Sequence, residues 1–267
     1  MRCLFEQAVT IRLLAVFMLL LVFFACENRQ EKVEVIADSE TIGKTSVPTD
    51  TIQEPVTPDS QYCALEQAIV DAGLVNVKQV LPAVLVDLKY TTEDNFMGLD
   101  LYGELNRCYL QPDVAIKLKR AYNYLQHKDS SLTFLVYDGV RPRSVQQAMW
   151  DTLDMPAVEK AKYVSNPQKG SLHNFGAAID LTLAYKENGE TLDMGTPFDF
   201  FGIEAYPMKE PLMLEKNRIT QEAVDNRKLL RRCMMEGGFF NIQTEWWHFN
   251  SCYREEAIEL YEIVEGG

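Results

Sequence analysis

The apolar residues after residue 60 change repeatedly between the period of two that is typical of a strand and the wider spacing that is typical of a helix. The alternating pattern predicts strands over residues 83–90, 132–137, 178–185 and 239–250. The helical pattern predicts helices over residues 112–125, 144–153, 219–235 and 255–263. Because these elements alternate irregularly, with no internal repeat and no glycine-rich phosphate loop, an α+β fold is favoured over a doubly wound parallel sheet.

Residues 1–25 are typical of an export signal. Arg2 and Arg12 accompany an apolar run, residues 13–25, that is too short to cross a membrane comfortably. The run ends at Ala25-Cys26, which resembles the cleavage and acylation site of bacterial lipoproteins. We therefore predict a lipoprotein-type signal peptide over residues 1–25 and lipidation of Cys26, with an ordinary signal peptide or a short membrane anchor as the alternatives. Lipidation would make the protein exported, periplasmic and anchored to a membrane.

The segment after the signal differs in composition from the rest of the chain. Residues 26–60 are rich in Glu, Thr, Pro, Asp and Ser and contain few aromatic residues. Such a segment cannot bury enough apolar surface to offset the entropy lost on ordering. We predict a flexible linker over residues 26–60 and a single folded domain over residues 61–267, and the 47% hydrophobic content of the chain is sufficient for one core.

The charge of the chain limits its partners. It has 26 Lys and Arg residues against 39 Asp and Glu residues, which gives a formal net charge of −13 at pH 7. Binding to nucleic acid or to anionic lipid needs a basic patch, so nucleic acid is excluded and the lipid on Cys26 is the one expected membrane contact. A small molecule or a peptide is the favoured substrate.

Four cysteines follow the linker and show no close C-x-x-C spacing. In an exported protein they can form disulfides or remain buried thiols, and the sequence leaves both possibilities open for Cys63, Cys108, Cys233 and Cys252.

The chain has only three histidines, and two of them have acidic neighbours in the sequence. His173 precedes Asp180 across a glycine-containing turn, and His248 closes the segment Glu245-Trp246-Trp247-His248. A catalytic zinc takes three protein ligands from imidazole and carboxylate groups and leaves one position for water. His173, Asp180 and His248 satisfy that number, and Glu245 is then suited to accept the proton of the water. His127, on a polar helix face, is predicted to be a surface residue.

The spacing of these residues sets two structural conditions. His173 and Asp180 are seven residues apart, and in a regular strand an odd offset places side chains on opposite faces. The glycine-containing turn must therefore redirect His173. Glu245 and His248 are three residues apart, so a bulge or a strand end must lie between them. Either histidine alone is more often a structural residue than a ligand, and the prediction depends on the combination.

The pattern Ser-x-His-x-x-Gly-x-Ala-x-Asp over residues 171–180, followed by Glu-x-Trp-His over residues 245–248, resembles the zinc D-alanyl-D-alanine peptidases. Three further stretches, residues 87–96, 137–142 and 194–200, are similar to the dipeptidases of that family, and the resemblance spans roughly residues 65–255. It implies a single α+β domain of the Hedgehog/D-Ala-D-Ala metallopeptidase type, with a central, mainly antiparallel sheet flanked by helices.

The resemblance also implies roles for individual residues. His173, Asp180 and His248 would hold one Zn²⁺ per chain, Glu245 would be the general base, and Arg141 would stabilise the oxyanion. A structural ion pair with Asp138 is the alternative for Arg141. The matching positions that line the substrate site in the family are Tyr90, Ser171 and Asp199, for which a strand-end Tyr, a loop-capping Ser and a turn Asp are the structural alternatives.

Three functions remain open from the sequence. The resemblance favours a zinc dipeptidase that cleaves D-Ala-D-Ala, or a related dipeptide, in the cell envelope during peptidoglycan turnover. A D,D-carboxypeptidase acting on peptidoglycan stem peptides is the nearest alternative, although residues 94–96 resemble the part of the dipeptidases that closes off the site. A lipoprotein that only binds wall peptides would not require both Glu245 and Arg141.

Overall fold

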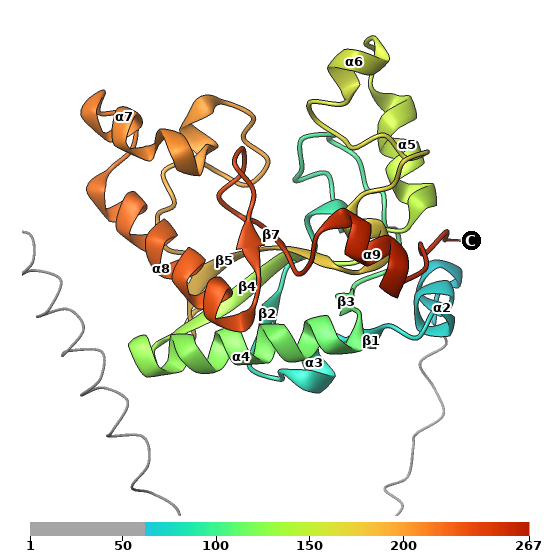
Figure 1. The fold of residues 1–267 in the computed structure, drawn as a ribbon, viewed down its shortest axis with the longest axis horizontal. Helices are drawn as coiled ribbons and strands as arrows, with labels where there is room; N and C mark the ends of the chain where they lie inside the picture. The colour runs from blue at the N-terminus through green and yellow to red at the C-terminus, as the bar shows by residue number, and fades with distance from the viewer. Residues whose placement is uncertain (1–61, 267) are drawn as a thin grey trace, which may run out of the picture. The chain divides into compact units, whose positions relative to one another are not determined.

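The computed structural model describes residues 62–266, which form a mixed α+β fold around a five-stranded sheet (Figure 1). The strand order is β2-β4-β5-β7-β6, in which β2 and β4 are parallel and the other neighbours are antiparallel. The strands are β2 (Leu85–Val86), β4 (Leu132–Asp138), β5 (Ala178–Tyr185), β6 (Phe240–Asn241) and β7 (His248–Asn250). The predicted α+β class and the mainly antiparallel sheet are therefore confirmed. The predicted signal, linker and Cys26 lie outside the described residues.

The two central strands, β4 and β5, form the buried centre of the fold. Seven of the eight residues of β5 are buried, because both of its faces are covered. Ile179, Leu181 and Leu183 alternate with Asp180 and Thr182 along the strand, so one face is apolar and the other carries polar groups. The apolar face joins the main core, and the polar face is where the candidate site lies.

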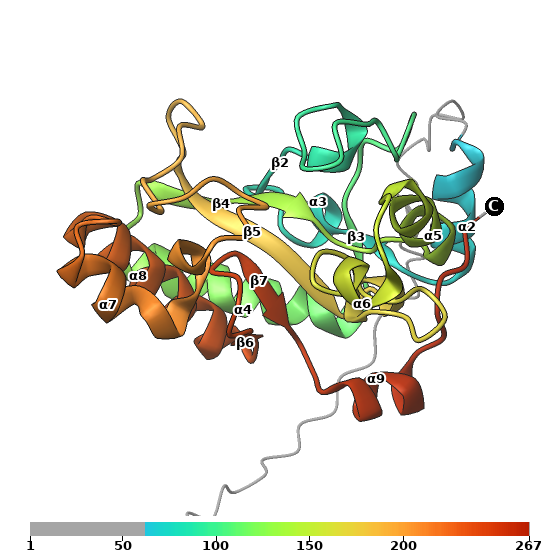
Figure 2. The ribbon, with the colours of Figure 1, turned by 90° about the horizontal axis from the view of Figure 1, so that it is seen from above.

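Two long helices cover the apolar face. Figures 1 and 2 show α4 (Pro112–Lys128) and α8 (Gln221–Gly237) side by side along β4 and β5. Pro112 occupies the first turn of α4, where its missing N–H has no helical partner to lose. A Cβ on Gly237 would lie 2.7 Å from the Ala121 Cβ, so the close approach of the two helices requires glycine there. The α5 helix (Arg143–Thr152) and α6 (Ala157–Lys160) lie toward the other face of the sheet.

The remaining elements are short. A second sheet pairs two antiparallel strands, β1 (Val75–Asn76) and β3 (Tyr109–Leu110). The other helices are α2 (Ala64–Asp71), α3 (Val77–Val80), α7 (Glu210–Glu215) and α9 (Arg254–Leu260). Four 3₁₀ helices complete the described chain, namely η1 (Lys89–Thr91), η2 (Leu172–Phe175), η3 (Ile203–Ala205) and η4 (Pro207–Lys209).

Two predicted strands differ from the structure. The strand expected over residues 83–90 pairs only at Leu85–Val86, because the chain turns into η1 and buries Tyr90 there. The strand expected over residues 239–250 is wrong, since β6 and β7 are antiparallel partners separated by a loop. Asn241 stabilises that loop by donating hydrogen bonds to the Glu245 and His248 carbonyl oxygens at 2.8 and 2.7 Å.

The structure also answers the question about the cysteines. Cys63, Cys108, Cys233 and Cys252 are all free thiols, and three of them are buried.

Among residues 62–266, no helix combines the length and apolar character that crossing a membrane requires.

Candidate metal centre and active site

His173, Asp180 and His248 come from three different elements. Asp180 lies on β5 and His248 on the neighbouring β7, where the two residues are direct partners in the antiparallel register. His173 lies in η2, which ends at Gly176 with a φ of 66°, a left-handed conformation that favours glycine. A Cβ at Gly176 would also lie 2.6 Å from the Leu74 Cδ2. The turn therefore redirects His173 toward the sheet, as the sequence spacing required.

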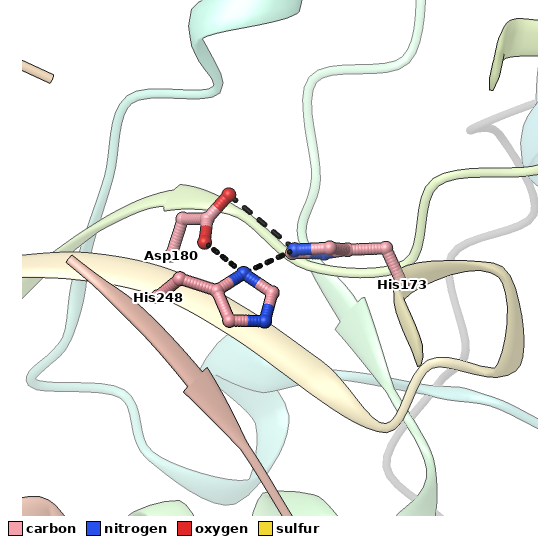
Figure 3. Close-up of side chains that lie close together, drawn as sticks. All are labelled: His173, Asp180 and His248. Carbon is pink, nitrogen blue, oxygen red and sulfur yellow. Dashed lines mark hydrogen bonds and ion pairs between the residues drawn. The ribbon is translucent and has the colours of Figure 1, made fainter. Parts of the chain in front are cut away.

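The side-chain donor atoms of these three residues converge on one point, as Figure 3 shows. His173 Nε2 lies 3.1 Å from His248 Nδ1, and His248 Nδ1 lies 3.0 Å from Asp180 Oδ1. The second carboxylate oxygen of Asp180 lies 3.4 Å from His173 Nε2. Within the described residues, this is the one group of histidine, cysteine and acidic side chains that meets the spacing of a metal site.

The outer nitrogen of each imidazole has its own hydrogen-bond partner. His173 Nδ1 lies 2.7 Å from the carbonyl oxygen of Gly139, which can only accept, so this nitrogen carries a proton. His248 Nε2 lies 2.8 Å from Asn250 Oδ1, which is likewise an acceptor. In their neutral forms the two histidines therefore turn lone pairs toward each other and toward a carboxylate. Two lone pairs at 3.1 Å repel unless a cation lies between them.

This donor set fits zinc. Ligand atoms on a tetrahedral zinc are about 3.4 Å apart, because each bond to nitrogen or oxygen is about 2.1 Å long. The three distances in this site, 3.1, 3.0 and 3.4 Å, lie within a few tenths of an ångström of that value. Two histidines and one carboxylate also leave a coordination position for water, as in catalytic zinc sites.

The charges around the site favour a bound cation. Burial alone would raise the pKa of Asp180, but the imidazoles of His173 and His248 hold it well below its ordinary value. Burial would lower the pKa of His248, but the hydrogen bond with Asp180 raises it to about 9. A metal ion bound by these ligands would therefore compete with protons for the same nitrogen and oxygen atoms.

Glu245 lies next to the three converging residues but outside their cluster. It precedes β7 in the loop held by Asn241, and its Oε2 is 3.9 Å from His248 Nδ1. The strand end that the sequence spacing required is thus present between Glu245 and His248. Its side chain is 28% exposed, through the cavity that it lines. Burial raises the pKa of Glu245 above its ordinary value, and the negative charge of Asp180 adds to this effect.

Arg141 also borders the site, and several contacts hold its guanidinium group. Its Nε and Nη2 donate to Asp138 Oδ2 at 2.9 and 2.6 Å, so the ion pair considered as its alternative role is present. Nη2 also lies 3.8 Å from Asp180 Oδ2, and the guanidinium carbon lies 4.8 Å from the centre of the Tyr90 ring. The same guanidinium borders the cavity. The ion pair with Asp138 therefore fixes the orientation of a cation at the candidate site.

A cavity of about 320 Å³ contains these groups and all three predicted substrate-site residues, Tyr90, Ser171 and Asp199. The Tyr90 hydroxyl donates to Asp199 Oδ2 at 3.0 Å. Asp199 has a φ of 57°, a conformation that non-glycine residues adopt rarely and that concentrates at functional sites. Burial raises the pKa of Asp199 well above its ordinary value, with a further contribution from Asp180.

Ser171 is the N-cap residue of η2, and its backbone N–H donates to Asn174 Oδ1 at 2.7 Å, so the loop-capping position considered as its alternative is present. Its hydroxyl donates to Gln146 Oε1 at 2.9 Å, and Gln146 is fully buried in α5. Asn174 also donates to Gln146 Oε1 and to the Arg141 carbonyl oxygen. A buried amide network therefore connects the wall of the cavity to the helix that follows Arg141.

Sequence reasoning missed three residues of this region, namely Gln146, Asn250 and Arg254. The position of Asn250 was accessible, because it follows His248 by two residues and shares its face of the strand. Gln146 and Arg254 reach the site through long-range contacts that leave no local pattern. His127 is exposed in the last turn of α4, away from the cavity, as predicted.

The chain is similar to known peptidases over most of its length. A family model described as D-Ala-D-Ala dipeptidase matches residues 70–260. The D-alanyl-D-alanine dipeptidase of Escherichia coli is 35% identical over 176 residues, which cover 66% of this chain and 83% of the relative. The corresponding dipeptidase of Enterococcus faecalis is 31% identical and covers 66% of this chain and 90% of the relative. Among solved structures, the vancomycin resistance D,D-pentapeptidase VanY in complex with Zn(II) is 14% identical, with a TM-score of 0.34, and the match covers 59% of this chain and 80% of that chain.

Proposed function

Because the chain belongs to the D-Ala-D-Ala dipeptidase family of peptidases, we propose that it hydrolyses D-alanyl-D-alanine to two molecules of D-alanine with one zinc ion held by His173, Asp180 and His248. The observation that carries this proposal is the convergence of the three donor groups beside Glu245 and Arg141 in a single cavity. Holding a metal would need neither of the last two residues, whereas peptide hydrolysis uses both a base and a cation.

Zinc bound at this site would act as a Lewis acid and lower the pKa of a water molecule. Glu245 is the proposed general base, which takes a proton from the attacking water and delivers it to the leaving amine. The raised pKa of Glu245 suits this exchange, since a base works best when its pKa is near the working pH. Tetrahedral attack places negative charge on the former carbonyl oxygen, and the fixed guanidinium of Arg141 is available to stabilise it.

Asp199 is the proposed partner of the substrate ammonium group. Its carboxyl group borders the cavity, and burial, with a further contribution from the charge of Asp180, raises its pKa. An arriving ammonium group supplies a positive charge and favours the ionised form of Asp199. The hydrogen bond from Tyr90 fixes one carboxylate oxygen while the other remains available to the ligand.

We also propose that the enzyme acts in the cell envelope, on dipeptides released during peptidoglycan turnover. The support for this location is the predicted lipoprotein signal over residues 1–25, with Cys26 as the site of acylation. Export would separate the enzyme from cytoplasmic cell-wall precursors. Labelling cells with a fatty-acid analogue and comparing the chain with a Cys26→Ala variant tests the anchor, and absence of label on the unaltered chain would contradict it.

The substrate is tested with purified, zinc-loaded protein and a panel of D,D-, L,D- and L,L-dipeptides and stem peptides, with identification of the products. We expect release of D-alanine from D-Ala-D-Ala at a higher kcat/KM than from any longer peptide. Cleavage of stem peptides alone would instead identify a D,D-carboxypeptidase. Binding of wall peptides with no cleavage at all, unchanged in a Glu245→Ala variant, would identify a binding protein.

A further inference from the structure

Two arginines border the catalytic cavity, and they differ in how their charge is balanced. Arg141 forms ion pairs with Asp138 at 2.6 Å and with Asp180 at 3.8 Å. Arg254, at the beginning of α9, donates instead to two backbone carbonyl oxygens, from Nη1 to Gly170 at 2.7 Å and from Nη2 to Lys169. Within residues 62–266, no carboxylate lies within 4.0 Å of its guanidinium nitrogens. Arg254 therefore brings an uncompensated positive charge to the cavity of a protein whose net charge is −13.

The position of Arg254 is fixed by its contacts. Gly170 directly precedes Ser171, the residue before η2. The guanidinium is therefore hydrogen-bonded to the segment that leads into the 3₁₀ helix containing His173. An arginine has five N–H donors, and the two contacts with Gly170 and Lys169 leave others for a ligand. The planar guanidinium matches a carboxylate in geometry as well as in charge.

The substrate of the proposed function carries one charge at each end. Asp199 provides a carboxyl group for the ammonium end, on the wall formed with Tyr90. The carboxylate end needs a cation, and Arg141 is already held by two carboxylates. Arg254 is the second arginine of the cavity, and Ser171 lies next to its contact residue Gly170.

We propose that Arg254 binds the C-terminal carboxylate of the substrate and thereby restricts cleavage to a peptide bond followed by a single residue with a free carboxylate. This inference rests on the proposed function for the identity of the substrate. It assigns Arg254 a binding role, because the residue contacts the end of the substrate and leaves the reacting carbonyl to other groups. A purely structural role, in which Arg254 only joins α9 to residues 169–170, gives a different result in the test below.

The test pairs a change in the protein with a change in the ligand. D-Ala-D-Ala and D-Ala-D-alaninamide differ only in the C-terminal carboxylate, and zinc-loaded wild-type, Arg254→Met and Arg254→Lys proteins are compared on both. We expect Arg254→Met to lower kcat/KM for the dipeptide by about 10- to 100-fold, mostly through KM, because a charge-assisted hydrogen bond to the ligand is lost. Cleavage of the amide should change by less than about threefold, since it lacks the partner group.

The lysine variant and a distant variant provide the controls. Arg254→Lys keeps the charge without the planar fork, so we expect a smaller loss and a retained preference for the free carboxylate. Arg232→Met removes a 58% exposed arginine of α8 outside the cavity and should leave both substrates unaffected. Equal losses on the dipeptide and the amide in Arg254→Met would overturn the binding role and leave a structural one.

Calorimetry with proteins that carry Glu245→Ala, with and without Arg254→Met, separates this inference from the proposed function. It measures binding of D-Ala-D-Ala and of D-Ala-D-alaninamide to each protein. We expect Arg254→Met to weaken binding of the intact dipeptide in this background and to leave binding of the amide nearly unchanged. If wild-type protein binds the dipeptide through Arg254 but never cleaves it, the proposed function fails and the inference stands. If the protein cleaves the dipeptide and Arg254→Met has no effect on it, the inference fails alone. If the protein neither binds nor cleaves the dipeptide, both are overturned.

Discussion

Replacement of Asn250 by alanine should weaken zinc binding without removing a ligand. Asn250 Oδ1 lies 2.8 Å from His248 Nε2 and accepts a hydrogen bond from that nitrogen. The contact keeps the proton on Nε2 and the lone pair on Nδ1, the atom that faces His173 and Asp180. Without it, His248 is free to adopt the other tautomer and to rotate, and both changes reduce the fraction of molecules that are ready to bind metal.

The expected loss of zinc affinity in Asn250→Ala corresponds to the removal of one hydrogen-bond partner from a metal-binding histidine. Removing an outer partner of a metal-binding histidine typically costs about 10- to 100-fold in metal affinity, or about 1.4–2.7 kcal/mol at 1.36 kcal/mol for each factor of ten. His173 keeps its backbone partner Gly139, so the loss is confined to one ligand. Competition with a chromophoric chelator at fixed pH measures the zinc dissociation constant of both proteins.

An Asn250→Asp variant is the matched control, because it keeps an acceptor oxygen at the same position. We expect it to retain zinc affinity within about tenfold of the unaltered protein or to exceed it, since a carboxylate partner makes the imidazole a stronger donor. Equal zinc affinity in the alanine variant and the unaltered protein would refute the assignment of Asn250 as the residue that fixes the tautomer of His248.

Four other predictions follow from the same geometry. Glu245→Gln should lower kcat by about 10²- to 10⁴-fold while one zinc per chain remains bound, because a base is removed and no ligand is, and loss of zinc by metal analysis would argue against that role. Asp138→Asn should lower the free energy of unfolding by about 3–5 kcal/mol in denaturant titrations, since it leaves the buried Arg141 charge without its closest partner. Gly139→Ala should cost about 1–3 kcal/mol, because the new Cβ would lie 2.5 Å from Cys108 Sγ and 2.8 Å from the Tyr109 carbonyl oxygen, and unchanged stability would contradict this. Asp199→Asn should lower kcat/KM for D-Ala-D-Ala by about 10- to 100-fold and leave N-acetylated dipeptide nearly unaffected, since the acetylated substrate has no ammonium group.

The sequence predicted the central strands well because their patterns are local. The alternation over residues 178–185 gave the bounds of β5 as the structure has them, and Pro112 marked the start of α4. The two spacing conditions at His173 and Glu245 were also met, by a glycine with positive φ and by the end of a strand. These features depend on residues close to one another in the chain.

The features that the sequence missed depend on distant contacts. The tryptophan-containing loop before His248 interrupts an apolar pattern that resembles a continuous strand, and the hydrogen bonds of Asn241 that hold it are visible only after folding. Arg254 reaches the cavity because α9 packs near residues 169–170, which precede it by more than eighty positions. No periodicity within one segment could place these groups at the site.

We propose that cleavage of D-Ala-D-Ala depends on a zinc ion held by His173, Asp180 and His248. The most direct measurement removes metal with a chelator, adds zinc back in steps, and records both bound zinc and the release of D-alanine. We predict that activity disappears on removal, returns in proportion to bound zinc, and reaches its maximum at one zinc per chain. Full activity in the metal-free protein, or no release of D-alanine with one zinc bound to each chain, would contradict this dependence on zinc.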